Sequence, residues 1–119
     1  MITVIIPSLN EEENIGSVVL FAKENPLVTE VLVVDDKSID STVRIAQDSG
    51  ARVITSTRIG KGGSMREGVM FATNEVVVFL DADINPYPHF TIKLLTEPIL
   101  QGGADFVKSS FNRNAGRVT

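Results

Sequence analysis

Short runs of almost entirely apolar residues recur along this 119-residue chain, and longer amphipathic segments separate them. Apolar and polar residues do not alternate within these runs, so a strand formed by one of them must be covered on both faces. We predict five strands, over Thr3–Ile6, Glu30–Val34, Arg52–Ile54, Val76–Leu80 and Ala104–Lys108. Because strands that alternate with helices are joined by right-handed crossovers, this order predicts one α/β domain over residues 1–119, with a three-layer, mostly parallel sheet.

Four helices should connect these strands, and three of them have an apolar stripe at helical spacing. We expect Asn10 to cap the first helix and Asp40 to cap the second, which should end at Gly50 in a left-handed conformation. Pro88 suits the first turn of the fourth helix, which should end at Gly102–Gly103. The apolar stripes are Ile15, Val18, Val19 and Ala22 in the first helix, Met65, Val69 and Ala72 in the third, and Ile92, Leu95 and Ile99 in the fourth.

Composition argues against several classes of function. The chain has 11 Lys and Arg against 15 Asp and Glu, and this net charge of −4 argues against generic nucleic-acid binding, which needs a basic surface. It has no cysteine and one histidine, His89, so disulfides, zinc–thiolate sites and a histidine-rich metal site built from these residues are excluded. Its apolar runs are too short to span a bilayer, and the N-terminus lacks the features of a signal peptide. We therefore expect a cytoplasmic protein with no membrane segment in this chain.

A polar segment follows each of the first four predicted strands. In a parallel sheet the carboxyl ends of the strands meet at one edge, where open α/β proteins bind ligands. Turns and helix caps explain Asn10, Ser38 and Asp40 equally well, but they do not explain two acidic groups at the same edge. The segments are Pro7–Glu11, Asp35–Ser38, Arg58–Gly63 and Asp81–Asp83.

Asp81 and Asp83 form the acidic group with the clearest chemical interpretation. Two residues apart in a nearly extended chain, their side chains can face one side, with backbones roughly 6.6 Å apart. Two such charges repel by about 2.5 kcal/mol at an effective dielectric of about 20, and a bound cation removes the repulsion. Magnesium binds one or two carboxylates together with water and substrate phosphates, so the pair predicts a metal–diphosphate site, with a solvated strand end as the alternative. The turn Gly60–Gly63 could hold an anion through its N–H groups and Lys61, or be an ordinary flexible turn.

In this order, the motifs resemble those of nucleotide-sugar glycosyltransferases with the GT-A fold. The general signature is Pro-Ser-Leu-Asn-Glu at 7–11, Val-Val-Asp-Asp at 33–36 and Asp-Ala-Asp at 81–83. The segments that are similar to glucosyl-3-phosphoglycerate synthases are Gly60–Gly62, Val78–Pro86, Val107–Ser109 and Gly116–Thr119. Lys37 departs from the pattern, because these enzymes often carry glycine there. The resemblance implies a GT-A fold, in which a Rossmann-like half binds the nucleotide.

The resemblance also implies which residues meet the nucleoside. Pro7, Leu9 and Glu11 would lie against it, with Glu11 on the ribose hydroxyls. Asp36 and Ser38 would lie by the uracil ring.

The reaction implied by the resemblance is a retaining, metal-dependent transfer of glucose from UDP-glucose to 3-phosphoglycerate. Gly60 and Lys61 would approach the nucleotide, and Asp81 would contact the ribose or the donor sugar. Asp83 would bind Mg²⁺ or Mn²⁺ through the diphosphate. Asp81 and Asp83 are therefore the expected catalytic residues.

Gly116, Arg117 and Thr119 would hold the phosphoglycerate acceptor, with Arg117 as the partner of its anionic groups. Enzymes of this family are much longer than 119 residues, so the chain resembles their nucleotide-binding half. We expect these 119 residues alone to bind nucleotide without transferring sugar. The predicted strand Ala104–Lys108 could form an exposed sheet edge, which would favour a homodimer.

Three other functions fit parts of the pattern. A polyprenyl-phosphate sugar transferase has a similar N-terminal half, and a nucleotide-binding fragment without turnover would keep the same motifs. A haloacid-dehalogenase-like phosphatase also uses an Asp-x-Asp motif after an apolar strand. In that class the motif usually follows the first strand, whereas here it follows the fourth.

Overall fold

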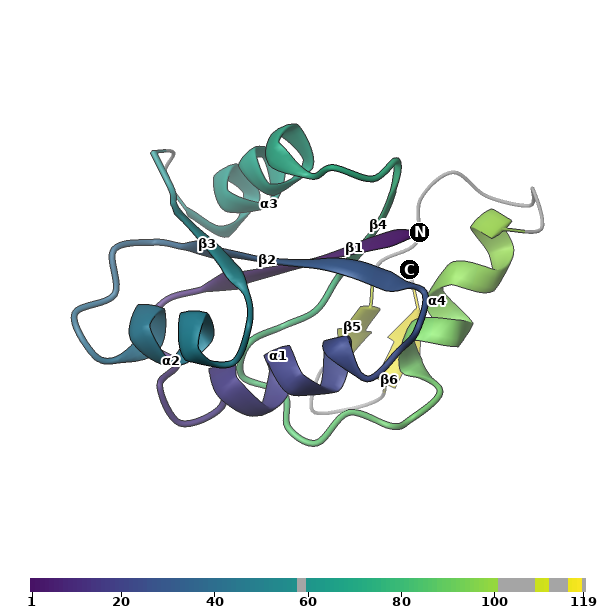
Figure 1. Cartoon of the computed structure of the whole chain (residues 1–119), viewed down its shortest axis with the longest axis horizontal. Helices are drawn as coiled ribbons and strands as arrows, with labels where there is room; N and C mark the ends of the chain where they lie inside the picture. The colour runs from purple at the N-terminus through teal and green to yellow at the C-terminus, as the bar shows by residue number, and fades with distance from the viewer. Residues whose placement is uncertain (58–59, 101–108, 112–115, 119) are drawn as a thin grey trace.

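The structure, a computed structural model, describes residues 1–57, 60–100, 109–111 and 116–118. Four parallel strands form its main sheet, in the spatial order β3-β2-β1-β4 (Figure 1). They are β1 (Ile2–Ser8), β2 (Val28–Asp35), β3 (Arg52–Thr55) and β4 (Val76–Phe79). The first four predicted strands are confirmed, with ends that differ by one or two residues. The fifth, Ala104–Lys108, and the stop at Gly102–Gly103 lie outside the described residues, so the homodimer stays a prediction.

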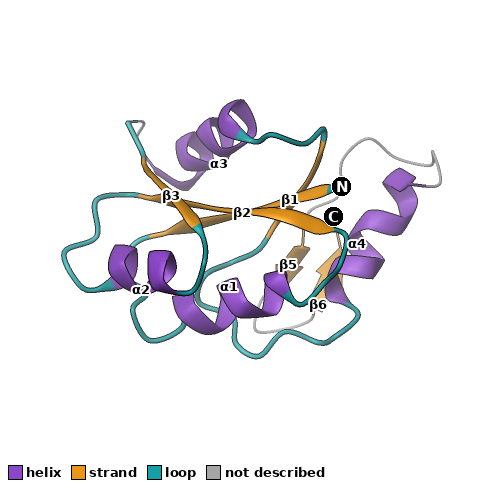
Figure 2. Cartoon of the chain, in the orientation of Figure 1, coloured by secondary structure: helices purple, strands orange, loops and turns teal. Residues whose placement is uncertain are grey.

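Helices cover both faces of the sheet and make the three layers that the sequence predicts (Figure 2). One face carries α3, and the other carries α1, α2 and α4. Their bounds are α1 (Ile15–Lys23), α2 (Thr42–Asp48), α3 (Gly60–Phe71) and α4 (Thr91–Leu100). A short antiparallel pair, β5 (Ser109–Phe111) and β6 (Gly116–Val118), was not predicted. In the described ranges, no helix has the length and apolarity needed to cross a bilayer.

Residues of the central strand β1 alternate between two apolar cores. Val4 and Ile6 pack among α1, α2 and α4, whereas Ile5 packs on the side of α3. All three side chains are fully buried. Burial on both faces explains why the strands appear in the sequence as continuous apolar runs.

Two helices begin later than predicted, and the prediction for each start is wrong. The residue before α1 is Asn14, whereas Asn10 has a left-handed φ of 52° and its side-chain oxygen accepts the Ile39 N–H at 2.9 Å. Asn10 therefore joins two loops at the carboxyl edge instead of capping a helix. Pro88 precedes α4, and its carbonyl accepts both the N–H and the hydroxyl of Thr91, at 3.0 and 2.7 Å.

The ends of α2 follow the sequence more closely. Asp40 Oδ1 accepts the N–H of Thr42, the first helical residue, at 2.9 Å, although Ser41 takes the cap position. Gly50 follows the helix with a φ of 102°, and its N–H donates to the Gln47 carbonyl at 3.0 Å. The predicted end of this helix at a left-handed Gly50 is therefore confirmed. Glycine suits the position because residues that carry a Cβ rarely adopt this conformation.

The buried face of α3 differs from the predicted stripe at one position. Met65 and Ala72 pack against the sheet as predicted, but Val69 is half exposed. Gly68 lies at the contact instead, and a Cβ added there would lie 2.5 Å from Cγ2 of Ile5. The backbone of α3 therefore sits directly on β1, which brings the start of the helix to the carboxyl edge of the sheet.

Gly68→Ala should destabilise the fold by about 1 kcal/mol. Forcing a methyl group against buried Ile5 costs about 2 kcal/mol. The better helix propensity of alanine offsets about 1 kcal/mol of that cost. Thermal unfolding should show a midpoint lower by roughly 4 °C. Gly62→Ala in the same helix is the control, because nothing lies within 4 Å of the added Cβ, and its midpoint should rise. Similar midpoints for the two variants would contradict this close packing.

Candidate active site

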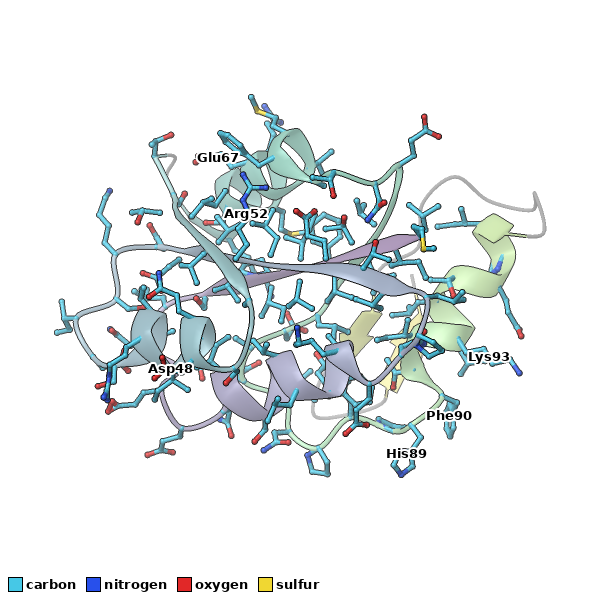
Figure 3. All side chains as sticks on the ribbon, in the orientation of Figure 1. Asp48, Arg52, Glu67, His89, Phe90 and Lys93 are labelled. Atoms are coloured by element: carbon cyan, nitrogen blue, oxygen red, sulfur yellow. The ribbon has the colours of Figure 1, made fainter. Side chains whose placement is uncertain are left out.

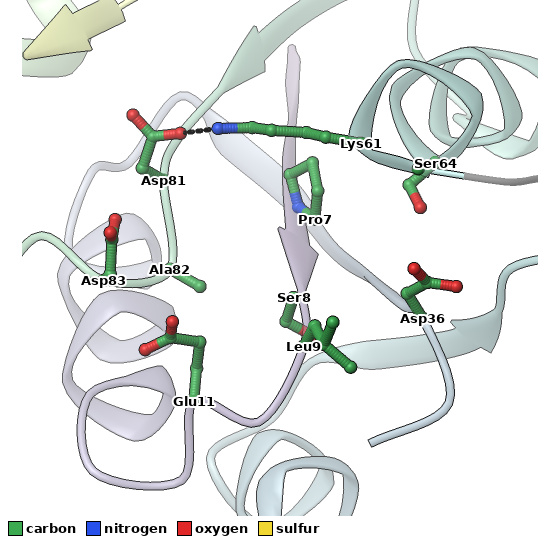
Figure 4. A pocket seen from close by; sticks show the side chains of 11 residues that line it. Pro7, Ser8, Leu9, Glu11, Asp36, Lys61, Ser64, Asp81, Ala82 and Asp83 are labelled. Carbon is green, nitrogen blue, oxygen red and sulfur yellow. Dashed lines mark hydrogen bonds and ion pairs between the residues drawn. The ribbon is translucent and has the colours of Figure 1, made fainter.

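The carboxyl edge of the sheet holds a cavity of about 300 Å³. It lies where the strand order reverses, because β1 has β2 on one side and β4 on the other. Open α/β sheets bind ligands at such a switch point. Four separate segments line the cavity (Figure 4): Pro7, Ser8, Leu9 and Glu11; Asp36; Gly60, Lys61 and Ser64; and Asp81, Ala82 and Asp83.

Eight of these lining residues are predicted site residues. They are Pro7, Leu9, Glu11, Asp36, Gly60, Lys61, Asp81 and Asp83. Ser8, Ser64 and Ala82 also line the cavity and were not predicted. The only signal for buried Ser64 was its position in the sequence, one helical turn after the glycine-rich start of α3.

The other four predicted site residues lie elsewhere or are not described. The hydroxyl of Ser38 donates to Asp35 at 2.6 Å and accepts the Asn10 N–H at 2.8 Å, so it holds two loops together. Gly116 and Arg117 belong to β6, and Thr119 lies outside the described residues. The roles of these four residues stay predictions.

Pro7 shapes the cavity through the N–H that it lacks. The Ile5 carbonyl points toward β4, where it accepts the Leu80 N–H at 3.0 Å. Pro7 lies two residues later in β1, so its backbone nitrogen points to the same side. The pairing of β1 with β4 ends at Ile5 and Phe79. Without a donor at Pro7 the ladder cannot continue, so the two strands diverge and leave space between their ends.

The two aspartates at the end of β2 have different environments. Asp35 is buried and accepts hydrogen bonds from the Ser8 hydroxyl at 3.1 Å and from the Ser38 N–H at 2.8 Å. Asp36 is half buried and lies on the cavity wall, so it is the carboxylate that a ligand can reach. Lys37 has a φ of 61°, which costs a residue with a Cβ about 1 kcal/mol. The departure at Lys37 from the glycine expected by resemblance therefore carries a cost in backbone conformation.

Glu11 and Asp83 lie at the same end of the cavity and make that end acidic (Figure 4). Burial raises the pKa of Glu11 above its ordinary value, and the negative charge of Asp83 raises it further. A cation at this end would relieve both effects. Among the described residues, no group of three or more His, Asp or Glu side chains could hold a metal ion. A Mg²⁺ ion that is shared with a diphosphate needs only one or two carboxylates, and the carboxylate oxygens of Glu11 and Asp83 are donors of the kind that Mg²⁺ or Mn²⁺ takes.

Lys61 forms an ion pair with Asp81 across the cavity (Figure 4). The predicted repulsion between Asp81 and Asp83 took no neighbouring cation into account, and the Lys61 ammonium group corrects that point. The lysine side chain is 54% exposed and the aspartate side chain 15% exposed, so the lysine is the more accessible partner. Gly60, with a φ of 77°, begins α3 just before Lys61. A helix start beside an accessible ammonium group suits a phosphate ligand.

Buried Glu67 fixes the segment that leads into α3, a role that was not predicted. Its carboxylate accepts the Ser56 hydroxyl at 3.1 Å and the N–H and hydroxyl of Thr57 at 2.8 and 3.2 Å. Figure 3 shows Glu67 on α3, above the sheet. An acidic residue inside a helix carries no local signal for this role, because its partners lie ten or eleven residues earlier.

Comparison with known sequences decides the family. Residues 3–118 match the family described as Glycosyl transferase family 2. This chain belongs to glycosyl transferase family 2. Family 2 membership argues against the phosphatase alternative, and the sheet together with the solved structures described next confirms the predicted GT-A-type α/β fold.

Two curated relatives within family 2 show how far the similarity extends. Glucosyl-3-phosphoglycerate synthase of Mycolicibacterium paratuberculosis is 37% identical over 124 residues, which cover 94% of this chain and 37% of that protein. An uncharacterized glycosyltransferase of Mycobacterium bovis is 38% identical over 106 residues, which cover 89% of this chain and 46% of that protein. The chain spans less than half the length of these relatives.

Solved structures of Mycobacterium tuberculosis glucosyl-3-phosphoglycerate synthase share this fold. The complex with UDP gives a TM-score of 0.84 at 32% identity, over 96% of this chain and 45% of that chain. The complex with Mn²⁺, UDP-glucose and phosphoglyceric acid gives a TM-score of 0.78 at 35% identity, over 86% of this chain and 40% of that chain. The resemblance inferred from the sequence motifs is thus confirmed.

Proposed function

We propose that this chain provides the UDP-glucose site of a metal-dependent, retaining glucosyltransferase whose acceptor is 3-phosphoglycerate. The observation that carries the proposal is the convergence of eight predicted donor-site residues, from four separate segments, on one cavity. The mycobacterial synthase that resembles this chain has been solved with Mn²⁺, UDP-glucose and phosphoglyceric acid, which supports the same substrates here.

The cavity has two chemically different ends, and these fit the two ends of UDP. At one end Asp36 and Ser64 face each other (Figure 4), and a carboxylate there can accept the N–H of uracil. At the other end lie Glu11 and Asp83, with Lys61 close by. Glu11 would accept ribose hydroxyls, and Asp83 would hold the divalent cation against the diphosphate.

A divalent cation bound at Asp83 would neutralise charge on the diphosphate as it leaves. The ammonium group of Lys61 is placed to add to this by moving from Asp81 to a phosphate oxygen. That exchange would free the Asp81 carboxylate for the ribose or the sugar. The two ends of the ion pair thus acquire separate roles when UDP-glucose binds.

In the proposed transfer, the acceptor hydroxyl attacks the anomeric carbon from the face that UDP leaves. The bond from that carbon to the diphosphate oxygen breaks, the bond to the acceptor oxygen forms, and the hydroxyl proton passes to the departing diphosphate. Attack and departure on one face retain the anomeric configuration. Gly116, Arg117 and Thr119 are proposed to hold the phosphoglycerate, since a guanidinium group binds carboxylate and phosphate oxygens well.

Nucleotide selectivity tests this proposal directly. In isothermal titration calorimetry with Mn²⁺, UDP and UDP-glucose should bind the 119-residue chain at least tenfold more tightly than ADP or GDP, a difference of about 1.4 kcal/mol or more. The expected reason is that only uracil offers its N–H to Asp36 in a cavity of this size. Equal affinities for the three diphosphates would contradict a UDP-sugar donor.

Asp36→Asn should weaken the binding of UDP about fivefold and leave its dependence on Mn²⁺ intact, because a neutral amide accepts a hydrogen bond less strongly than a carboxylate. Calorimetry with Mn²⁺ and with EDTA measures both effects. Asp48→Asn, at the exposed end of α2, is the matched control for the lost charge. If the metal dependence disappeared in Asp36→Asn, the roles of the two acidic ends would be wrongly assigned.

A further inference from the structure

We propose that Tyr87 is a positioning residue for the donor site: its buried hydroxyl holds the backbone of Asp81 and so aims the Asp81–Asp83 segment into the cavity. The inference rests on the proposed function, since the importance of this segment follows from UDP and metal binding there. Tyr87 itself is absent from the cavity wall, and neither the motifs nor the comparisons single it out.

The hydroxyl of Tyr87 makes two hydrogen bonds with one residue. It accepts the Asp81 N–H at 2.7 Å and donates to the Asp81 carbonyl at 3.0 Å. Burial raises the pKa of Tyr87 far above its usual range, so the hydroxyl keeps the proton that the second bond needs. One side chain therefore satisfies both backbone groups of a residue on the cavity wall.

These bonds replace a missing strand neighbour. The Leu80 N–H points toward β1, where it donates to the Ile5 carbonyl, so the N–H and carbonyl of Asp81 point away from β1. In the described sheet β4 is an edge strand, and no strand lies on that outer side. Tyr87, six residues along the chain, folds back to take both groups. The backbone at Asp81 is thus defined by a side chain at the point where the sheet ends.

Tyr87 is in turn fixed from the core. Its side chain is 5% exposed, and its ring stacks on Phe21 of α1 with centroids 5.3 Å apart and planes at 21°. The loop that carries Asp81 and Asp83 is therefore tied to α1 through an aromatic contact. Loss of a group that orients a metal-binding carboxylate typically lowers the affinity for the metal about tenfold or more.

A purely structural role would involve the ring, whereas the proposed role involves the hydroxyl. Tyr87→Phe keeps the ring that stacks on Phe21 and removes the hydroxyl, with its two hydrogen bonds to Asp81. Thr96→Val is the matched control, because Thr96 is also buried and its hydroxyl donates to the Ile92 carbonyl at 2.8 Å within α4. It removes a buried hydroxyl that does not contact the donor site.

The experiment measures UDP binding by calorimetry with Mn²⁺ and with EDTA, below the unfolding midpoint of each variant. Tyr87→Phe should weaken binding about tenfold with Mn²⁺ and much less with EDTA, while Thr96→Val leaves both affinities unchanged. Binding by Tyr87→Phe within twofold of the original chain would overturn the proposal. An equal loss of UDP affinity with Mn²⁺ and with EDTA would also overturn it, because that result would indicate a general loosening of the fold around the cavity.

A second readout does not depend on the ligand. Hydrogen exchange at the Asp81 amide should be at least tenfold faster in Tyr87→Phe than in Thr96→Val, because its acceptor is gone. If the original chain binds no UDP, the proposed function fails, but this exchange rate still decides whether Tyr87 holds Asp81. Unchanged exchange at Asp81 would overturn the positioning role on its own.

Discussion

Asp83→Asn should weaken the binding of UDP in the presence of Mn²⁺ about a hundredfold, or about 2.8 kcal/mol. Asp83 lies exposed at the acidic end of the cavity, opposite Glu11, and is the residue proposed to share a cation with the diphosphate. Because a metal ion shared with a diphosphate is held by only one or two carboxylates, the loss of one should remove most of the protein's hold on the metal. In EDTA the variant and the original chain should bind UDP equally weakly.

Asp48→Asn provides the control for this experiment, since it removes the same charge at the end of α2 (Figure 3) and Asp48 does not line the cavity. Its affinity for UDP should stay within twofold of the original value. An Asp83→Asn chain that keeps its response to Mn²⁺ would show that the metal binds elsewhere.

Lys61→Met should weaken the binding of UDP with Mn²⁺ about thirtyfold, or about 2 kcal/mol, which lies in the range for hydrogen bonds to charged groups. The ion pair with Asp81 shows that the ammonium group reaches across the cavity. Methionine keeps most of the length of the side chain and removes the ammonium group, with its charge and its hydrogen-bond donors. At the same time Mn²⁺ alone should bind more tightly, because Asp81 loses its cationic partner.

Lys93→Met is the matched control for Lys61→Met. Lys93 is 73% exposed on α4 and also has an acidic partner, Glu97, at 3.8 Å. Its loss should change neither affinity, since a surface pair of this kind contributes little. A loss of metal binding in Lys61→Met, with unchanged binding of UDP, would reverse the roles that we assign to the ion pair.

The architecture was predictable because one physical pattern recurs. Continuous apolar runs such as Val31–Val34 require cover on both faces, and helices between parallel strands supply it. Helix starts were less predictable. Asn10 has the side chain of a cap, but its partner Ile39 lies 29 residues away, and local patterns do not contain such contacts. The predicted position of Val69 was wrong for a related reason, since helical spacing does not show that Gly68 contacts Ile5.

The site was predictable to the extent that topology places it. Strand ends in a parallel sheet meet at one edge, so Glu11, Asp36 and Asp83 could be expected to lie together. The ion pair of Lys61 depends on how closely α3 approaches the end of β4, which no motif encodes. Tyr87 was missed because it acts through the backbone of another residue, and its sequence context is that of a loop aromatic.

The central claim is that the cavity between the ends of β1 and β4 binds UDP together with a divalent cation. Nuclear magnetic resonance on the ¹⁵N-labelled chain tests this most directly, by titration with UDP and Mg²⁺ followed by replacement of Mg²⁺ with paramagnetic Mn²⁺. The amide signals of Glu11, Asp36 and Lys61 should shift, and Mn²⁺ should broaden signals around Asp83 at much lower concentrations when UDP is present than when it is absent. Shifts centred on the separate cavity of about 240 Å³ beside His89, or broadening around Asp83 that UDP does not strengthen, would contradict the claim.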